Sequence, residues 1–85
     1  MPDPASTIQH TRVLRRVDPG HGMARFYALM IERDLFGTIR LVRHWGRIGS
    51  RQGRELAQEF TTLAEAAAAL ERLAATKRRR GYHDL

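Results

Sequence analysis

The sequence contains no cysteine, so disulfide bonds and cysteine-based zinc sites are excluded. It has no apolar run near the ~20 residues that cross a bilayer, and residues 1–7 lack the basic and apolar regions of a secretory signal. A chain of 85 residues has room for one domain with one modest core. We therefore expect a cytoplasmic protein without membrane contact, in which residues 1–7 are a flexible leader and residues 8–85 form a single domain.

Groups that could perform catalysis or hold a metal ion are also scarce. The aspartates lie in turns or near the termini, and no serine has a base at the spacing of a known nucleophile motif. The histidines lie on different segments without metal-ligand spacing. We expect no catalytic residue, no metal site and no cofactor, and hence a non-enzymatic protein. The histidines are His10, His21, His44 and His83.

Positive charge is what the chain has in excess. The formal net charge is +6, from 15 basic and 9 acidic side chains, and every basic residue except Lys77 is arginine. Codon bias in a GC-rich genome would produce this preference. A functional reason is equally consistent, because the guanidinium group suits phosphate better than an ammonium group does. The charge balance thus favours a polyanionic partner without fixing the fold.

Alternating apolar residues predict four strands, at residues 8–17, 23–33, 39–48 and 54–60. Turns are expected at residues 18–22 and 34–38, with Gly37 in the left-handed conformation. The second strand is apolar on both faces and should be central, whereas the polar fourth strand should be an edge. If that edge is open, the oligomeric state is either a monomer or a weak homodimer.

The apolar period changes to that of a helix after residue 62. Thr62 and Glu65 form a capping box, and Gly81 is placed to end the helix after a run of cations from Lys77 to Arg80. Residues 82–85 then add a short strand or pack on the sheet. The pattern β-β-β-β-α predicts an α+β fold, an antiparallel sheet of four to five strands with one C-terminal helix on a face.

The segment from residue 40 to residue 54 contains five arginines and no acidic residue. Arg43, Trp45 and Arg47 share one strand face at spacings of ~6.5–7 Å, close to the ~7 Å that separates phosphates along a DNA strand. An indole between guanidinium groups offers a stacking surface between phosphate contacts. Two alternatives remain open, with Trp45 as a core residue and Arg47 in an ion pair with Glu55 or Glu59.

The stretch around Trp45-Gly46-Arg47 resembles the WGR domain, a module of poly(ADP-ribose) polymerases and of bacterial proteins. The similarity extends over about residues 10–83 and includes the turn at residues 49–53 and the helix end from Lys77 to Gly81 and Tyr82. The resemblance implies contact with DNA near a strand break or end. It implies that the indole packs on the terminal sugar and base and that the motif arginine bridges DNA and neighbouring domains.

Two functional hypotheses follow for the chain. The first is a module that binds nucleic acid, with DNA favoured, at ends, nicks or single-stranded flanks. The second is a protein-interaction adaptor in which the same basic face docks an acidic partner. For both, the relative placement of the basic cluster at residues 77–80 and the Trp45 face is open. The residues expected to bind nucleic acid are Trp45, Arg47, Arg43, Arg51 and, as further backbone contacts that the resemblance implies, Lys77 and Tyr82.

Overall fold

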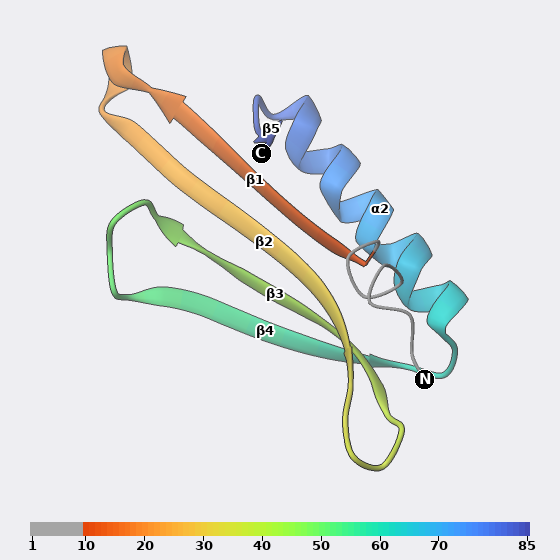
Figure 1. The fold of residues 1–85 in the computed structure, drawn as a ribbon. Helices are drawn as coiled ribbons and strands as arrows, with labels where there is room; N and C mark the ends of the chain where they lie inside the picture. Colours follow the sequence, from red (N-terminus) through yellow and green to blue (C-terminus); the bar gives the residue numbers. More distant parts are fainter. Residues whose placement is uncertain (1–9) are drawn as a thin grey trace.

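A computed structural model describes residues 10–85, which form a five-stranded antiparallel sheet with one helix packed on a face (Figure 1). The predicted α+β fold is confirmed. The expected leader, residues 1–7, and residues 8 and 9 lie outside the described part of the chain. The elements, in chain order, are β1 (Thr11–Asp18), the 3-10 turn η1 (Pro19–His21), β2 (Met23–Arg33), β3 (Ile39–Arg47), β4 (Gly53–Phe60), α2 (Leu63–Arg79) and β5 (His83–Asp84).

The strands are arranged in the order β4-β3-β2-β1-β5. Three successive hairpins build the first four strands, and β5 returns after the helix to pair with β1. The apolar β2 is central and the polar β4 is an edge, as their patterns predicted. The predicted third strand is one residue too long, because β3 ends at Arg47. The N–H of Ile48 still donates to the carbonyl oxygen of Ala24 at 2.9 Å, which continues the pairing with the β2 side by one hydrogen bond.

The turn between β2 and β3 is closed by two backbone hydrogen bonds and by one carboxylate. Asp34 Oδ1 accepts hydrogen bonds from the backbone N–H groups of Phe36 and Thr38, both at 2.9 Å. Gly37 has a φ of 82°, which is the left-handed conformation expected from the sequence. The tip of this turn presents Leu35 and Phe36 to solvent, so it contributes nothing to the core.

The core lies between the sheet and the alanine-rich face of α2. Thr62 caps the helix by accepting the N–H of Glu65 at 3.1 Å, and Gly81 ends it with a φ of 94°. Small helix side chains allow a close approach to the sheet, and burial of the larger ones stabilises the fold by about 1.5–3 kcal/mol each. The buried residues are Leu14, Tyr27, Leu29, Ile31, Ile39 and Leu41 from the strands and Ala66, Ala69, Leu70 and Ala74 from the helix.

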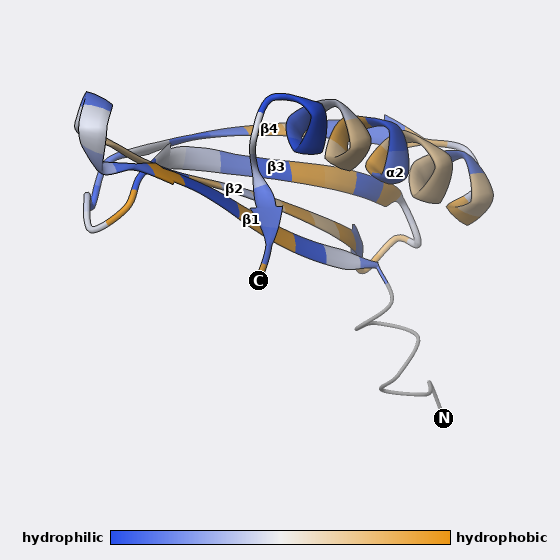
Figure 2. Ribbon diagram, turned by 90° about the horizontal axis from the view of Figure 1, so that it is seen from above, coloured by the Kyte–Doolittle hydropathy of each residue, from blue (hydrophilic) through white to orange (hydrophobic). Residues whose placement is uncertain are grey.

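The helix covers only part of the sheet. Figure 2 shows α2 above one half, while the β1–β2 hairpin and the β3–β4 turn extend beyond its C-terminal end. The longest dimension of the molecule is 46 Å. Side chains on the helix side of this extension therefore lie open beside the last helical turn. Within residues 10–85, no helix has the length and apolar character needed to span a membrane.

Candidate nucleic-acid interface

Trp45 stands on the helix side of β3, near the end of α2. In the strand register it lies between Tyr27 on β2 and Arg54 on β4. The indole is half-buried, and its ring centroid lies 6.2 Å from that of Tyr27 at a tilt of 32°. The core interpretation of this residue is thus partly correct, because Trp45 packs against the core without being sealed inside it.

Lys77 approaches the same place from the last turn of α2. Its Nζ lies 4.6 Å from the ring centroid of Tyr27 and 5.3 Å from that of Tyr82, within the range of cation–π attraction. Burial is the largest cause that lowers the pKa of Lys77 below its usual value, and the positive charges of Arg80, Arg43 and Arg25 lower it further. Lys77 is therefore a partly desolvated cation among other cations.

The chain after the helix holds Tyr82 in position. The backbone N–H of Tyr82 donates to the carbonyl oxygen of Lys77 at 3.0 Å, and that of Gly81 donates to Arg78 at 3.1 Å. The Arg78 guanidinium donates to both carboxylate oxygens of Asp84, at 2.7 and 2.8 Å. Asp84 lies in β5, so this bidentate pair fastens the short strand that follows Tyr82 to the helix end.

Three arginines form a row across the sheet beyond the helix. Arg16 on β1 lies opposite Arg25 on β2, which lies opposite Arg47 on β3. They share strand parity with Leu14, Tyr27 and Trp45, so they stand on the helix side. Within the described residues none of the three has a carboxylate partner. Like charges placed opposite each other in this way destabilise a sheet.

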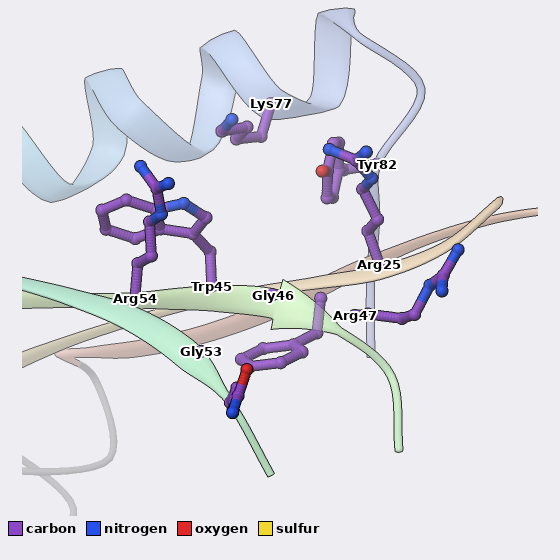
Figure 3. A pocket seen from close by; sticks show the side chains of 10 residues that line it. Arg25, Trp45, Gly46, Arg47, Gly53, Arg54, Lys77 and Tyr82 are labelled. Atoms are coloured by element: carbon purple, nitrogen blue, oxygen red, sulfur yellow. The ribbon is translucent and has the colours of Figure 1, made fainter. Parts of the chain in front are cut away.

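These side chains surround an open cleft of about 710 Å³. Figure 3 shows Trp45, Arg54 and Lys77 together between the sheet and the helix, with Arg25, Arg47 and Tyr82 toward the helix end. A second hollow of about 360 Å³ shares Trp45 and Lys77 with the first. Neither lining contains an acidic residue. The cleft is lined by Arg25, Phe26, Trp45, Gly46, Arg47, Gln52, Gly53, Arg54, Lys77 and Tyr82.

Most of the residues expected from the sequence lie together here. Trp45, Arg47, Lys77 and Tyr82 line the cleft, and Arg43 lines the adjoining hollow. Arg51 does not join them, because it lies in the exposed turn after β3 and lines neither space. Of the basic cluster at residues 77–80, Lys77 and Arg80 share the Trp45 side, whereas Arg78 pairs with Asp84 instead. The sequence left this relation open.

The alternative ion pair for Arg47 is absent from residues 10–85. Glu55 lies opposite His44, and Glu59 lies opposite Arg40, so both carboxylates stand on the face away from the helix. Arg47 stands on the helix side. The guanidinium group of Arg47 is thus left available to a ligand.

Sequence reasoning missed Arg16 and Arg25 as members of this surface, and it counted Arg54 and Arg80 in the basic segments without expecting them to bind. A usable signal was present for the first two. A hairpin that closes at residues 18–22 sets Arg16 against Arg25, and the alternation of β2 places Arg25 on the face of Tyr27. The contribution of Arg80 depends on where the helix ends above the sheet.

Gly46, the middle residue of the motif, has a packing role. It lies opposite Gly53, so neither strand carries a side chain at this pair. A Cβ on Gly46 would lie 3.2 Å from the Cα of Gly53 and 3.4 Å from Cε1 of Phe26, which covers the pair from the other face. The glycine pair lets the Phe26 ring approach the backbone closely below the cleft. Within residues 10–85 no group of three or more His, Asp or Glu side chains is placed to hold a metal ion.

Comparison with known proteins agrees with this motif and this fold. The family model of the WGR domain matches residues 10–85. A protein of Sinorhizobium fredii (strain NBRC 101917 / NGR234), called uncharacterized protein y4dW, is 44% identical over 69 residues. The matched region covers 81% of this chain and 33% of that protein, so the chain spans about a third of its relative's length. The chain belongs to the WGR domain family.

Proposed function

We propose that this chain has a binding, non-enzymatic role, in which the cleft around Trp45 holds nucleic acid, with DNA favoured. WGR domains are generally nucleic-acid-binding modules. The observation that carries the proposal is an acid-free cleft in which Lys77 is partly desolvated and the arginines opposite one another have no carboxylate partners within the described residues. Cations held close together in this way repel one another, and a bound anion offsets that repulsion.

The phosphate backbone supplies that anion. Arg25 and Arg47 stand on adjacent strands, and Lys77 faces them from the helix, so a phosphodiester backbone in the cleft meets cations from two sides. Arginine forks bind phosphate oxygens in pairs, and each phosphate neutralised releases counterions. Affinity should therefore fall steeply with salt and depend little on base sequence.

The indole gives the site a preference for unpaired bases. Trp45 is only half-buried, and Arg54 and Arg43 flank it on neighbouring positions of the helix-side face. An accessible aromatic face adds about 1–3 kcal/mol for each base stacked on it. Bases inside a duplex already stack on their neighbours, so a terminus, a nick or a single-stranded flank is the substrate that this arrangement favours.

The test is a fluorescence-anisotropy titration of labelled blunt, nicked and single-stranded oligonucleotides at two salt concentrations. Arg47→Gln should weaken binding to every substrate and reduce the salt slope by about one phosphate. Arg33→Gln is the matched control, because Arg33 is an exposed arginine at the other end of β2, opposite Ile39. Equal affinities for Arg47→Gln, Arg33→Gln and the unaltered chain would refute the proposal.

An acidic protein partner is the second candidate, and it would use the same cations. Such a partner has carboxylates but no stacked bases, so it needs the arginines and not the indole face. Trp45→Leu keeps apolar packing against the core and removes the stacking surface. Loss of oligonucleotide binding in Trp45→Leu supports nucleic acid, whereas protein associations that survive nuclease treatment and this substitution support the adaptor.

A further inference from the structure

The outer edge of β4 is long and open. All eight residues from Gly53 to Phe60 pair with β3 without interruption, and each except Phe60 is exposed. β4 is the terminal strand of the sheet, so its other side presents unpaired backbone N–H and C=O groups. At the opposite edge β5 has only two residues. β5 pairs with only Leu14 and Arg15 of β1, so the outer side of β1 is also partly open, but β4 is the longest continuous open strand within residues 10–85.

Edges of this length are usually protected. Proteins place a proline, a lysine or a bulge there, or cover the edge with another segment. β4 has no proline, lysine or bulge, and no segment of residues 10–85 pairs with its outer side. Its charged side chains are Arg54, Glu55 and Glu59. In some registers these place like charges opposite those of a second copy, and in other registers they do not.

Symmetry limits the registers for a second copy of this chain. Antiparallel pairing of two identical edges requires a two-fold axis perpendicular to the sheet, and that axis keeps the helix sides of both copies on the same face. Two residues opposite each other must then have side chains on the same face, so their numbers are both even or both odd. The axis therefore passes through one residue that lies opposite the same residue of the other copy. The choice is among single residues of β4.

Only one central position combines long pairing with compatible charges. An axis at Ala57 sets Glu55 against Glu59 twice, and an axis at Glu55 sets that glutamate against itself. An axis at Leu56 pairs seven residues of each strand without a like-charged pair. Its partners across the axis are Arg54 with Gln58, Glu55 with Ala57, and Gly53 with Glu59.

We propose that a second copy of this chain pairs with β4 edge to edge in the register centred on Leu56. Leu56 is 46% exposed, and the pairing packs it against its own copy on the helix side. The two sheets then become one continuous sheet with both helices on one face. The interface is small, so the dimer is weak and depends on protein concentration.

The dimer places both basic clefts on the same surface. Arg54 lines the cleft and lies two residues from the axis, so the two clefts lie next to the new interface on either side. A nucleic acid that reaches both clefts makes the second binding event intramolecular. The pairing itself does not depend on nucleic acid, so it can be tested on the protein alone.

The chain has no cysteine, so a variant with one introduced cysteine can form a disulfide only between that position in two copies. Opposite residues on antiparallel strands have Cα atoms about 4.5–5.5 Å apart, within the range that a disulfide bridges. Leu56→Cys should give a covalent dimer under mild oxidation. Ala57→Cys is the matched control on the same strand, because this register offsets its two copies beyond disulfide range.

Sedimentation equilibrium of the unaltered chain, without nucleic acid, is the second measurement. The weight-average mass should rise with concentration toward twice the 9.7 kDa of one chain, and Leu56→Lys should suppress that rise while leaving the circular dichroism unchanged. A constant mass of one chain would overturn the proposal. Cross-linking of Ala57→Cys as fast as Leu56→Cys would also overturn it, since that result indicates another register.

Discussion

Arg25 lies directly opposite Arg47 on neighbouring strands, and neither guanidinium group has a carboxylate partner within residues 10–85. Arg16 extends the row on the far side of Arg25. Like charges opposite each other cost about 0.2–1 kcal/mol in a sheet. A bound polyanion converts this repulsion into attraction, so the same residues that weaken the free domain should strengthen its complex.

This relationship predicts opposite effects of one substitution on stability and binding. Arg25→Gln should raise the free energy of unfolding by up to about 1 kcal/mol, because it removes the central charge of the row. The same change should weaken DNA binding and reduce the salt slope by about one phosphate. Urea denaturation and anisotropy measure the two effects. Arg33→Gln, on the same strand but outside the cleft, should change neither, and a destabilised Arg25→Gln with normal binding would contradict the account.

Lys77 predicts a proton linkage. Burial among arginines lowers the pKa of Lys77 below 10.5 in the free protein. A phosphate beside the ammonium group favours its charged form, so the pKa should rise when nucleic acid binds and binding should weaken as pH rises through the free-state pKa. Lys77 is the only lysine, so NMR titration of its side chain is free of overlap. An identical pKa with and without a saturating oligonucleotide would place the ligand elsewhere.

The glycine of the motif predicts a stability effect. In Gly46→Ala the new methyl group meets backbone atoms of Gly53 at 3.2 Å and Gln52 at 3.3 Å. Because these atoms belong to the paired strand, we expect a loss of about 1 kcal/mol in the free energy of unfolding. Gly20→Ala is the control, since its Cβ would meet only Asp18 Oδ1 at 3.6 Å. Equal stability of the two variants would show that the strands accommodate a methyl group.

The ion pair between Arg78 and Asp84 predicts a pH dependence at the C-terminus. The hydrogen bond from Arg78 lowers the pKa of Asp84 below 3.8, so the pair is intact above that value and is lost as pH falls through the depressed pKa. Asp84→Asn should remove it at every pH. Its effect should be faster hydrogen exchange of the Leu85 amide, which donates to Val13 at 3.0 Å.

The control for this prediction is another aspartate whose carboxylate contacts a nearby side chain. Asp18 pairs with His21 at the tip of the β1–β2 hairpin, away from the C-terminus. Asp18→Asn should leave the exchange of the Leu85 amide unchanged. If Asp84→Asn also leaves it unchanged, β5 is held by its backbone pairing with β1 alone.

Local signals in the sequence were sufficient for the elements. Alternation predicted the strands, Thr62 and Gly81 marked the helix ends, and Gly37 marked its turn. The shared face of Trp45 and Arg47 also followed from alternation, because a strand has a period of two residues. These features depend on a residue and its near neighbours, and the structure confirms them.

The assembly of the cleft depends on long-range geometry. Lys77 meets Trp45 because α2 crosses the sheet in one direction and ends above β2 and β3, which helical periodicity does not specify. Arg51 was placed with the site on charge alone, yet it lies in a turn, where alternation no longer fixes the direction of a side chain. The pairing of β5, the strand that follows Tyr82, with β1 is likewise a tertiary contact that the local sequence does not specify.

The central claim is that nucleic acid occupies the cleft beside Trp45. The chain has one tryptophan, so its emission reports on this position alone. The most direct measurement is a titration of that fluorescence with an unlabelled single-stranded oligonucleotide, alongside anisotropy of a labelled copy. We predict quenching that saturates with the anisotropy signal and weakens with salt. Binding seen by anisotropy with unchanged tryptophan emission, or no binding at low salt, would contradict the account.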